Sequence, residues 1–192
     1  MPVNPTRRAA LADAAIAVLA AEGARGLTHR AVDRAASEPA GTASNYFRTR
    51  AALYDALAAR IYERLSPAPE VLAHPASEPP SRERLHALIA DIVDRVTAQP
   101  ELTIALLELR LEATRRPEVQ VALTAFLRSQ FDADLAFNRA AGLDGGQDEI
   151  VLLHLAVDGL VLDQLTTPGA LPIGDRSARV AQIVDRLVPS AG

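Results

Sequence analysis

The sequence contains no cysteine and no tryptophan, and aromatic residues make up only 4% of its 192 residues. The lack of cysteine excludes disulfide bonds, thiolate metal ligands and a cysteine nucleophile, and it is compatible with a reducing cytoplasm. Apolar residues nevertheless make up 49% of the chain, with Ala and Leu dominant and runs of β-branched residues scarce. Because Ala and Leu favour helices, this composition indicates an all-α fold in which helices pack on helices.

Uninterrupted hydrophobic runs of membrane-spanning length are also lacking. The segment Ile150–Leu165 is the most apolar candidate, but three ionisable residues interrupt it, and it is shorter than the ~20 residues that a span needs. The apolar stretch after Arg7 and Arg8 contains two acidic residues and keeps helical spacing, which is unlike a signal peptide. We therefore expect a cytoplasmic protein with no membrane partner.

The net charge of −4 is unevenly distributed along the chain, and every basic side chain is arginine because lysine is absent. Residues 1–50 contain seven arginines and four acidic residues, whereas residues 51–192 contain thirteen arginines and twenty acidic residues. Only the first part is therefore basic. Since basic regions attract the phosphates of nucleic acids, residues 1–50 are the candidate nucleic-acid-binding part.

Three short helices are predicted in this basic part. Thr6 is a candidate N-cap for the first helix, which Gly23 and Gly26 are expected to end. Thr28 is expected to open the second helix, in which small apolar residues face inward and Asp33 lies on the polar face. Helices this short cannot stand alone, so their apolar sides must pack on one another.

A turn near residue 37 leads to the third predicted helix. Pro39 suits the first position of this helix, where its missing N–H is no loss. The segment Gly41–Asn45 then presents small and hydrogen-bonding side chains before Tyr46 and Phe47, of which Phe47 is expected in the core. Short polar side chains allow a helix to sit deep in the major groove of DNA.

The rest of the chain predicts six further helices, about nine in all. We expect a fourth helix to about Leu65, a fifth from Ser81 to Pro100, a sixth at about Glu101–Arg115, a seventh at about Pro117–Ala141, an eighth at about Gln147–Thr167 and a ninth capped by Asp175. The segment 66–81 contains five prolines, so no regular helix is expected there. It can be an exposed connector or an ordered loop lying on the body.

The eighth predicted helix is apolar almost all round and must therefore be covered on two sides. The seventh helix can cover one side, and a second copy of the chain is the natural cover for the other, with Gly159 permitting close approach. The helices at about 147–167 and 175–188 of two chains would then form a four-helix bundle. We therefore expect a homodimer.

These features together resemble the TetR/AcrR family of transcriptional regulators. The resemblance is carried by Leu27-Thr28, Ala35-Ala36, Gly41-Thr42 and above all by Asn45-Tyr46-Phe47-Arg48-Thr49-Arg50-Ala51-Ala52-Leu53. It is specific over roughly residues 6–60, and the stretch at 107–117 is similar to the sensor domain of one subgroup. The family usually has Gly in place of Ser37, an apolar residue in place of Glu38, Ser in place of Pro39, an aromatic residue in place of Ser44 and Lys in place of Arg50.

The resemblance implies a ligand-responsive repressor that acts as a homodimer on a palindromic DNA operator. It implies a DNA-binding helix-turn-helix domain at residues 1–50 and a larger helical ligand-binding and dimerisation domain at residues 51–192. Residues Thr28, Thr42, Tyr46 and Arg50 are expected to contact phosphates, and Ala43, Ser44, Asn45 and the nearby Arg30 are expected at base edges. A purely packed Tyr46 remains the alternative for that residue.

An unidentified small-molecule inducer is expected between the predicted fifth to eighth helices. Polar residues that could orient it are Thr103, Glu108, Arg110, Asn138, His154 and Asp158. His154 and Asp158 are four residues apart on one helix face, so they can instead form a hydrogen-bonded pair in the core or at a dimer seam.

Two other classes of function remain as alternatives: a small enzyme, and a helical dimeric interaction module without DNA binding. The four histidines are scattered, there is no His-Glu-x-x-His pair, and no glycine-rich phosphate loop follows a strand. We therefore expect no catalytic residues, no metal and no cofactor.

Overall fold

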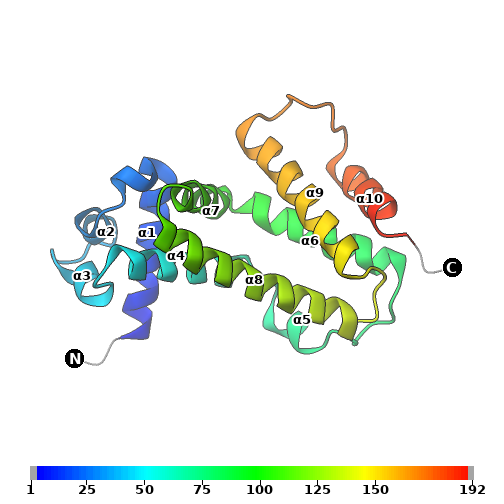
Figure 1. Ribbon diagram of the computed structural model, residues 1–192, viewed down its shortest axis with the longest axis horizontal. Coiled ribbons are helices and arrows are strands. Elements are labelled where there is room, and N and C mark those ends of the chain that lie inside the picture. Colours follow the sequence, from blue (N-terminus) through cyan, green and yellow to red (C-terminus); the bar gives the residue numbers. More distant parts are fainter. Residues whose placement is uncertain (1–3, 190–192) are drawn as a thin grey trace. The chain divides into compact units, whose positions relative to one another are not determined.

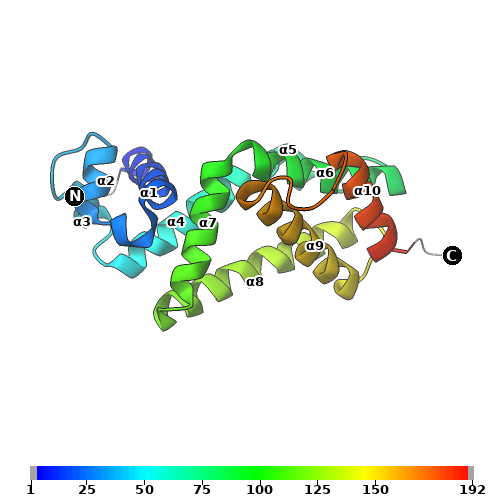
Figure 2. The ribbon, with the colours of Figure 1, turned by 90° about the horizontal axis from the view of Figure 1, so that it is seen from above.

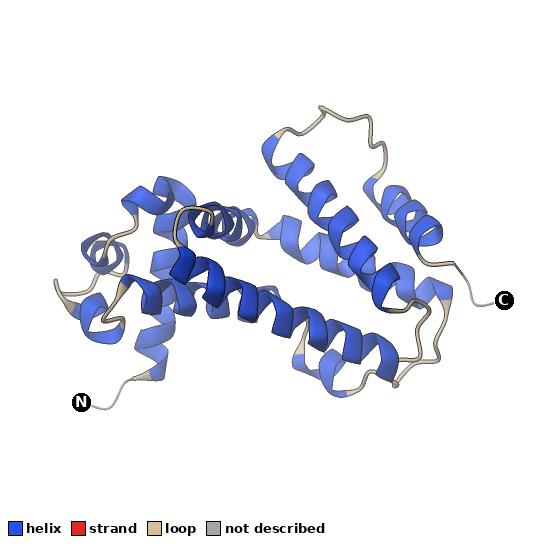
Figure 3. Cartoon of the chain, viewed as in Figure 1, coloured by secondary structure: helices blue, strands red, loops and turns tan. Residues whose placement is uncertain are grey.

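The computed structural model describes residues 4–189, and this part of the chain consists of ten α-helices joined by loops and turns, with no β-strand (Figure 3). The all-α fold predicted from composition is therefore confirmed. None of the helices in residues 4–189 is long and apolar enough to cross a lipid bilayer.

The helices form two compact units. The first unit contains the described residues up to Ser66 together with Gln99–Arg128, and the second contains Pro67–Ala98 together with the described residues from Ser129 onward. Helix α8 (Pro117–Ala140) therefore contributes its first half to one unit and its second half to the other. The predicted boundary near residue 50, between a DNA-binding and a ligand-binding domain, does not coincide with the division into these two units. It stays a prediction.

The first unit is built around α1 (Pro5–Gly26), which packs against α2 (His29–Ala35), α4 (Arg50–Leu65) and α7 (Pro100–Ala113) (Figure 1). The short α3 (Thr42–Tyr46) packs against α2. The side chains at the centre of this unit are fully buried and include Leu11, Ile16, Leu19, Phe47, Leu57 and Leu102. Phe47 is thus a core residue, as the sequence predicted.

The start of α1 differs from the prediction by two residues. Asn4, not Thr6, is the N-cap, because its Oδ1 accepts a hydrogen bond from the backbone N–H of Arg7 at 3.2 Å. Pro5 then occupies the first helical position, where it costs no backbone hydrogen bond. At the other end, Gly23 has a left-handed φ of 67° that kinks the helix, and the helix resumes as far as Gly26.

The second unit contains α6 (Arg82–Ala98), α9 (Gln147–Thr166) and α10 (Arg176–Leu187), which lie side by side (Figure 2). Ser81 caps α6, since its Oγ accepts from the N–H of Arg84 at 3.1 Å, and Asp175 caps α10. Both caps were predicted. The buried residues of this unit include Leu85, Val93, Leu135, Ile150, Leu153, Leu160, Val180 and Val184.

The prediction that no regular helix forms between residues 66 and 81 was wrong. A single-turn helix, α5 (Pro69–Ala73), begins with Pro69 at a position that needs no N–H donor, which raises the number of helices in residues 4–189 to ten instead of about nine. Most of this segment is exposed. Arg84 nevertheless holds it in place, because its guanidinium donates to the carbonyls of Pro75 at 2.6 Å and Glu78 at 2.7 Å.

Candidate nucleic-acid interface and ligand pocket

Helices α2 and α3 form the predicted helix-turn-helix, with a turn between Ala35 and Thr42. Thr28 caps α2 as expected, because its Oγ1 accepts from the N–H of Ala31 at 3.1 Å. Helix α3 begins at Thr42, so the prediction that Pro39 occupies its first position was wrong. The cause is Gly41, whose φ of 92° leaves the helical path just before Thr42.

Asp33 positions α3, a role that the sequence analysis missed. Its side chain is only 2% exposed, and its carboxylate accepts from the N–H groups of Gly41 at 2.8 Å and Ala43 at 2.6 Å. The helix-turn-helix therefore uses a charged side chain of α2 as the cap of α3, which has no side-chain cap of its own. The sequence signal for this role was an acidic residue eight positions before Gly41, the N-cap of α3, which has no side chain to cap the helix.

The turn between α2 and α3 contains three of the departures from the family pattern, at residues 37, 38 and 39. Ser37 has a φ of 54°, a left-handed conformation that glycine adopts without strain. Glu38 forms an ion pair with Arg7 in α1, where Nε lies 2.8 Å from Oε1 and Nη2 donates to Oε2. The hydrogen bond from Arg7 holds the pKa of Glu38 below its usual range. The negative charge of Glu38 is thus balanced by Arg7, which belongs to another helix.

The eight predicted DNA-binding residues differ in their accessibility. Thr28, Arg30, Ser44 and Asn45 are exposed, and Thr42, Tyr46 and Arg50 are half-buried. Ala43 is fully buried in the core, so its side chain is not available to a base edge, and we remove it from the candidate base contacts. The side chains of Arg30 and Asn45 have no hydrogen bond or ion pair within residues 4–189, which leaves both free to bind DNA.

Two of the candidate hydroxyls are engaged locally. Thr42 Oγ1 donates to the carbonyl of Pro39 at 2.7 Å, and Ser44 Oγ donates to the carbonyl of Gly41 at 2.9 Å. Their oxygens can still accept a hydrogen bond, but donation to a phosphate requires rotation of the hydroxyl. Arg48, which we did not assign to DNA, is exposed directly after α3 and has no hydrogen bond or ion pair to any described residue.

The segment after α3 is tied to the rest of the first unit. His29 Nε2 lies 2.6 Å from the carbonyl oxygen of Phe47, and because a carbonyl only accepts, this nitrogen carries the proton. The guanidinium of Arg8 lies over the Phe47 ring at 4.7 Å and donates to the carbonyl of Tyr46 at 3.3 Å. These bonds fix the end of α3 to α1 and α2.

Arg50 also has partners inside the first unit. Its Nε donates to the hydroxyl of Tyr54 at 2.9 Å, and its Nη2 donates to the carbonyl of Ala24 near the end of α1. The Tyr54 hydroxyl donates in turn to Oε1 of the buried Glu112, at 3.3 Å, which also accepts from Arg116. Burial raises the pKa of Tyr54, although the hydrogen bond from Arg50 opposes it, so the phenol keeps its proton.

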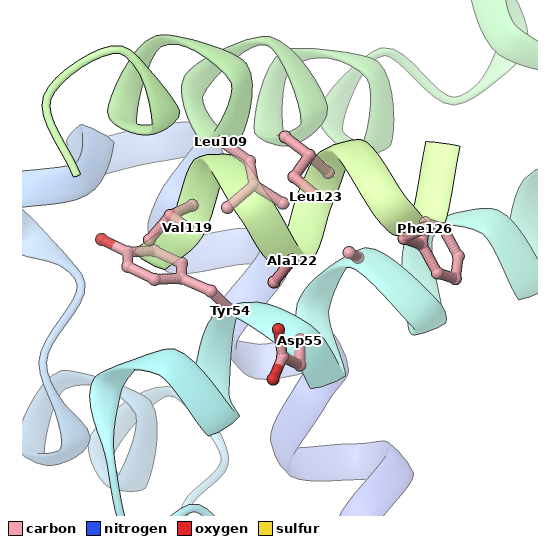
Figure 4. A pocket seen from close by; sticks show the side chains of 8 residues that line it. Tyr54, Asp55, Leu109, Val119, Ala122, Leu123 and Phe126 are labelled. Carbon is pink, nitrogen blue, oxygen red and sulfur yellow. The ribbon is translucent and has the colours of Figure 1, made fainter. Parts of the chain in front are cut away.

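A pocket of about 290 Å³ lies within the first unit, between α4, α7 and the first half of α8 (Figure 4). Its lining is mostly apolar and consists of Tyr54, Asp55, Ala58, Leu109, Val119, Ala122, Leu123 and Phe126. The carboxylate of Asp55 and the hydroxyl of Tyr54 are the only polar side-chain groups of this lining, and no basic side chain contributes to it. The size and composition fit a small organic ligand.

A match to a known protein family shows to which family this chain is related. A model described as "Tetracyclin repressor-like, C-terminal domain" matches residues 80–190, which is more than half of the chain. The chain belongs to the TetR family of transcriptional regulators. The family predicted from the helix-turn-helix residues is therefore confirmed. A comparison with curated protein sequences gave no match.

Solved structures of other TetR-family proteins have the same fold. The multidrug binding protein EbrR complexed with imidazole is 26% identical, with 98% of each chain covered and a TM-score of 0.71. The same protein complexed with ethidium is matched at 28% identity, over 97% of this chain and 100% of that chain, with a TM-score of 0.68. A TetR-family member from Streptomyces coelicolor A3 is 25% identical over 97% and 100%, with a TM-score of 0.69.

In this TetR-family protein the six polar residues predicted to orient an inducer do not line the pocket. Thr103, Glu108 and Arg110 belong to the first unit, whereas Asn138, His154 and Asp158 belong to the second. Thr103 is buried and Arg110 and Asp158 are exposed. The half-buried carboxylate of Glu108 faces Gly23, where an added Cβ would lie 3.4 Å from Oε2.

Two of these residues have evident structural partners. The Asn138 side-chain amide is buried and donates to the carbonyl of Gly145 at 3.0 Å, which holds the turn after α8. His154 Nε2 lies 3.3 Å from Oδ2 of Asp134, and its ring meets the Phe131 ring edge-on at 5.4 Å. Their predicted role toward a ligand stays a prediction.

Proposed function

We propose that this TetR-family regulator binds a palindromic DNA operator as a homodimer and represses transcription until a small-molecule inducer binds. The observation that carries the DNA-binding part is the exposed, unpartnered amide of Asn45 on a helix that Asp33 holds in place. An asparagine amide can donate to and accept from the edge of adenine at the same time, which discriminates between bases. Arg30 is the second base-reading candidate, because a guanidinium pairs with guanine in the same two-bond manner.

Phosphate contacts would set the register of the protein on the duplex. Thr28 is exposed, and since its Oγ1 accepts from Ala31, the hydroxyl proton remains available to a phosphate. Tyr46 is half-buried, so its role depends on its hydroxyl reaching the backbone of DNA. Arg50 would have to exchange its bonds to Tyr54 and Ala24 for a phosphate, which makes it the weakest of the phosphate candidates.

The proposed homodimer rests on the exposed face of α9. Leu152, Leu155 and Leu162 are 47%, 65% and 45% exposed, and Gly159 lies on the same face with no heavy atom within 4 Å of an added Cβ. Their spacing of three, four and three residues forms an apolar stripe of the kind that packs against an identical helix. A two-fold axis through this stripe would relate two recognition helices, as a palindromic operator requires.

The proposed ligand response is supported by the pocket in the first unit and by EbrR, a multidrug binding protein whose structures contain imidazole and ethidium. An inducer would bind more tightly to a state of the dimer in which the two recognition helices do not match successive major grooves. No catalytic step is part of this role.

The test is selection of DNA ligands from a random-sequence library with the full-length protein, followed by affinity measurements at several salt concentrations. An enriched inverted repeat is expected, and the protein should bind it at least about 1,000-fold more tightly than scrambled DNA. The affinity should fall steeply with salt because binding releases counterions. Failure to enrich any sequence would contradict the proposal and would favour a helical interaction module or an enzyme.

A further inference from the structure

We propose that the pocket between α4, α7 and α8 binds a small organic cation, that Asp55 is the charge partner of this cation, and that Tyr54 connects the pocket to the end of α1. The inference deepens the ligand response proposed above and rests on it.

The charge of the lining favours a cation. Asp55 is the only ionisable lining residue besides Tyr54, whose phenol stays neutral, and no arginine or histidine of the described chain lines the pocket. A lone carboxylate beside an apolar cavity attracts a cation and repels carboxylates and phosphates. Because Asp55 is exposed, solvent screens this attraction, so its contribution to the affinity is about 5- to 10-fold rather than the larger factor of a buried pair.

The walls suit an apolar or aromatic body next to the charge. Figure 4 shows Tyr54 and Asp55 on α4, opposite Ala122 and Leu123 on α8. Phe126 is held at one end by an edge-on contact with the Tyr62 ring, with centroids 5.0 Å apart and the planes at 71°. Aromatic rings attract cations through the negative potential of their faces. A compact cation with an aromatic group therefore matches both the charge and the surface of the pocket.

Tyr54 lines the pocket, and its hydroxyl belongs to a chain of hydrogen bonds. In Figure 4 its hydroxyl points away from Phe126 and Ala122. This hydroxyl accepts a hydrogen bond from Arg50 Nε. Arg50 Nη2 donates a second hydrogen bond to the carbonyl of Ala24, just before the helix-turn-helix. A ligand that displaces the ring weakens the Arg50 bond, so occupation of the pocket should loosen the chain at residues 20–28.

The charge is tested with a matched pair of probes, phenyltrimethylammonium and its uncharged isostere tert-butylbenzene, in ligand-observed NMR titrations of the full-length protein. Asp55→Asn should raise the Kd of the cation about 5- to 10-fold and leave the Kd of tert-butylbenzene unchanged. Ala122→Leu, which fills the pocket, should weaken both probes. Absence of cation binding, or an equal effect of Asp55→Asn on both probes, would overturn the proposal.

The connection is tested by hydrogen exchange of residues 20–28 with and without phenyltrimethylammonium. In the wild-type protein the cation should speed up exchange about fivefold, as expected for loss of one hydrogen bond. Tyr54→Phe keeps the ring but removes the hydroxyl, so exchange should already be fast and the cation should add nothing. Unchanged exchange in Tyr54→Phe would overturn the connection. Neither measurement uses DNA, so a failure of operator binding is recognised separately.

Discussion

The carboxylate of Asp33 accepts a hydrogen bond from the backbone N–H of Ala43 at 2.6 Å, so the first helix of the helix-turn-helix, α2, carries the cap of the second, α3. Helix α3 has only five residues and could not persist alone in water. Its position therefore depends on α2, which also determines where the side chain of Asn45 lies.

Replacement of Asp33 by alanine should lower the free energy of unfolding by about 2 kcal/mol, because two N–H groups lose a charged acceptor in a buried place. Asp33→Asn, which keeps one acceptor, should cost less. Urea unfolding measures both changes. The exposed Asp132→Ala in α8 is the control, and an Asp33 effect no larger than that of the control would contradict the capping role.

Replacement of Ser37 by glycine should raise the free energy of unfolding by about 0.5–1 kcal/mol. The φ of 54° is strained for serine but not for glycine, although the greater flexibility of glycine in the unfolded chain offsets part of the gain. Thermal unfolding tests this prediction. The same substitution at the helical, exposed Ser129 should destabilise the protein, and a stabilisation at both sites would argue against strain at residue 37.

The pair formed by Asp13 and Arg60 should make stability depend on acidity. Arg60 donates to both carboxylate oxygens of Asp13, at 2.9 and 2.8 Å, and Arg64 adds a third contact. Burial alone would raise the pKa of Asp13, but the bonds and charges of the two arginines outweigh it and hold this pKa below its usual range.

The pKa of Asp13 is lower in the folded than in the unfolded protein. Ionised Asp13 therefore stabilises the folded state fully above its unfolded pKa of about 3.9, and this stabilisation is lost as the pH falls through its folded pKa. Asp13→Asn should therefore destabilise the protein at pH 7, by about 1 kcal/mol because the pair is partly exposed. The difference between the two proteins should shrink in unfolding curves as the pH falls below the unfolded value of about 3.9. A difference that grows toward acid would be incompatible with this origin.

Asn45 and Arg48 should affect DNA binding in different ways. Asn45→Ala should cost about 1–3 kcal/mol on the selected operator and relax the base preference at one position of each half-site. Arg48→Ala should weaken binding equally on operator and scrambled DNA and reduce the slope of log affinity against log salt by about 1. Fluorescence anisotropy titrations with both DNAs separate the two effects. If Asn45→Ala lowered both affinities equally, it would not be a base contact.

The α9 stripe should decide the oligomeric state. Leu155→Glu places a charge at its most exposed leucine, so it should convert a dimer to a monomer in sedimentation equilibrium without lowering the helix content. Leu171→Glu, at an exposed leucine outside any described helix, is the control and should leave the mass unchanged. A monomeric wild-type protein, or a Leu155→Glu variant that remains dimeric, would rule out this interface.

Local patterns in the sequence were enough to predict most of the helices. Helices α4 and α6 to α10 lie close to their predicted positions because their starts are marked by prolines or by side chains that cap the nearest backbone amides. The helix-turn-helix and the burial of Phe47 were predictable because small apolar residues and aromatic residues follow each other in a characteristic order. These signals act over a few residues, so a single sequence contains them.

Contacts between distant residues could be decided only by the tertiary structure. Asp33 has the polarity of a surface residue, and only the packing of α2 against α3 converts it into a buried cap. Ala43 belongs to α3, but the rotation of that helix turns its side chain into the core. The pocket likewise joins Tyr54 to Phe126 across 72 positions of sequence. No local periodicity encodes such neighbours, because the fold brings them together by burying apolar surface over its whole length.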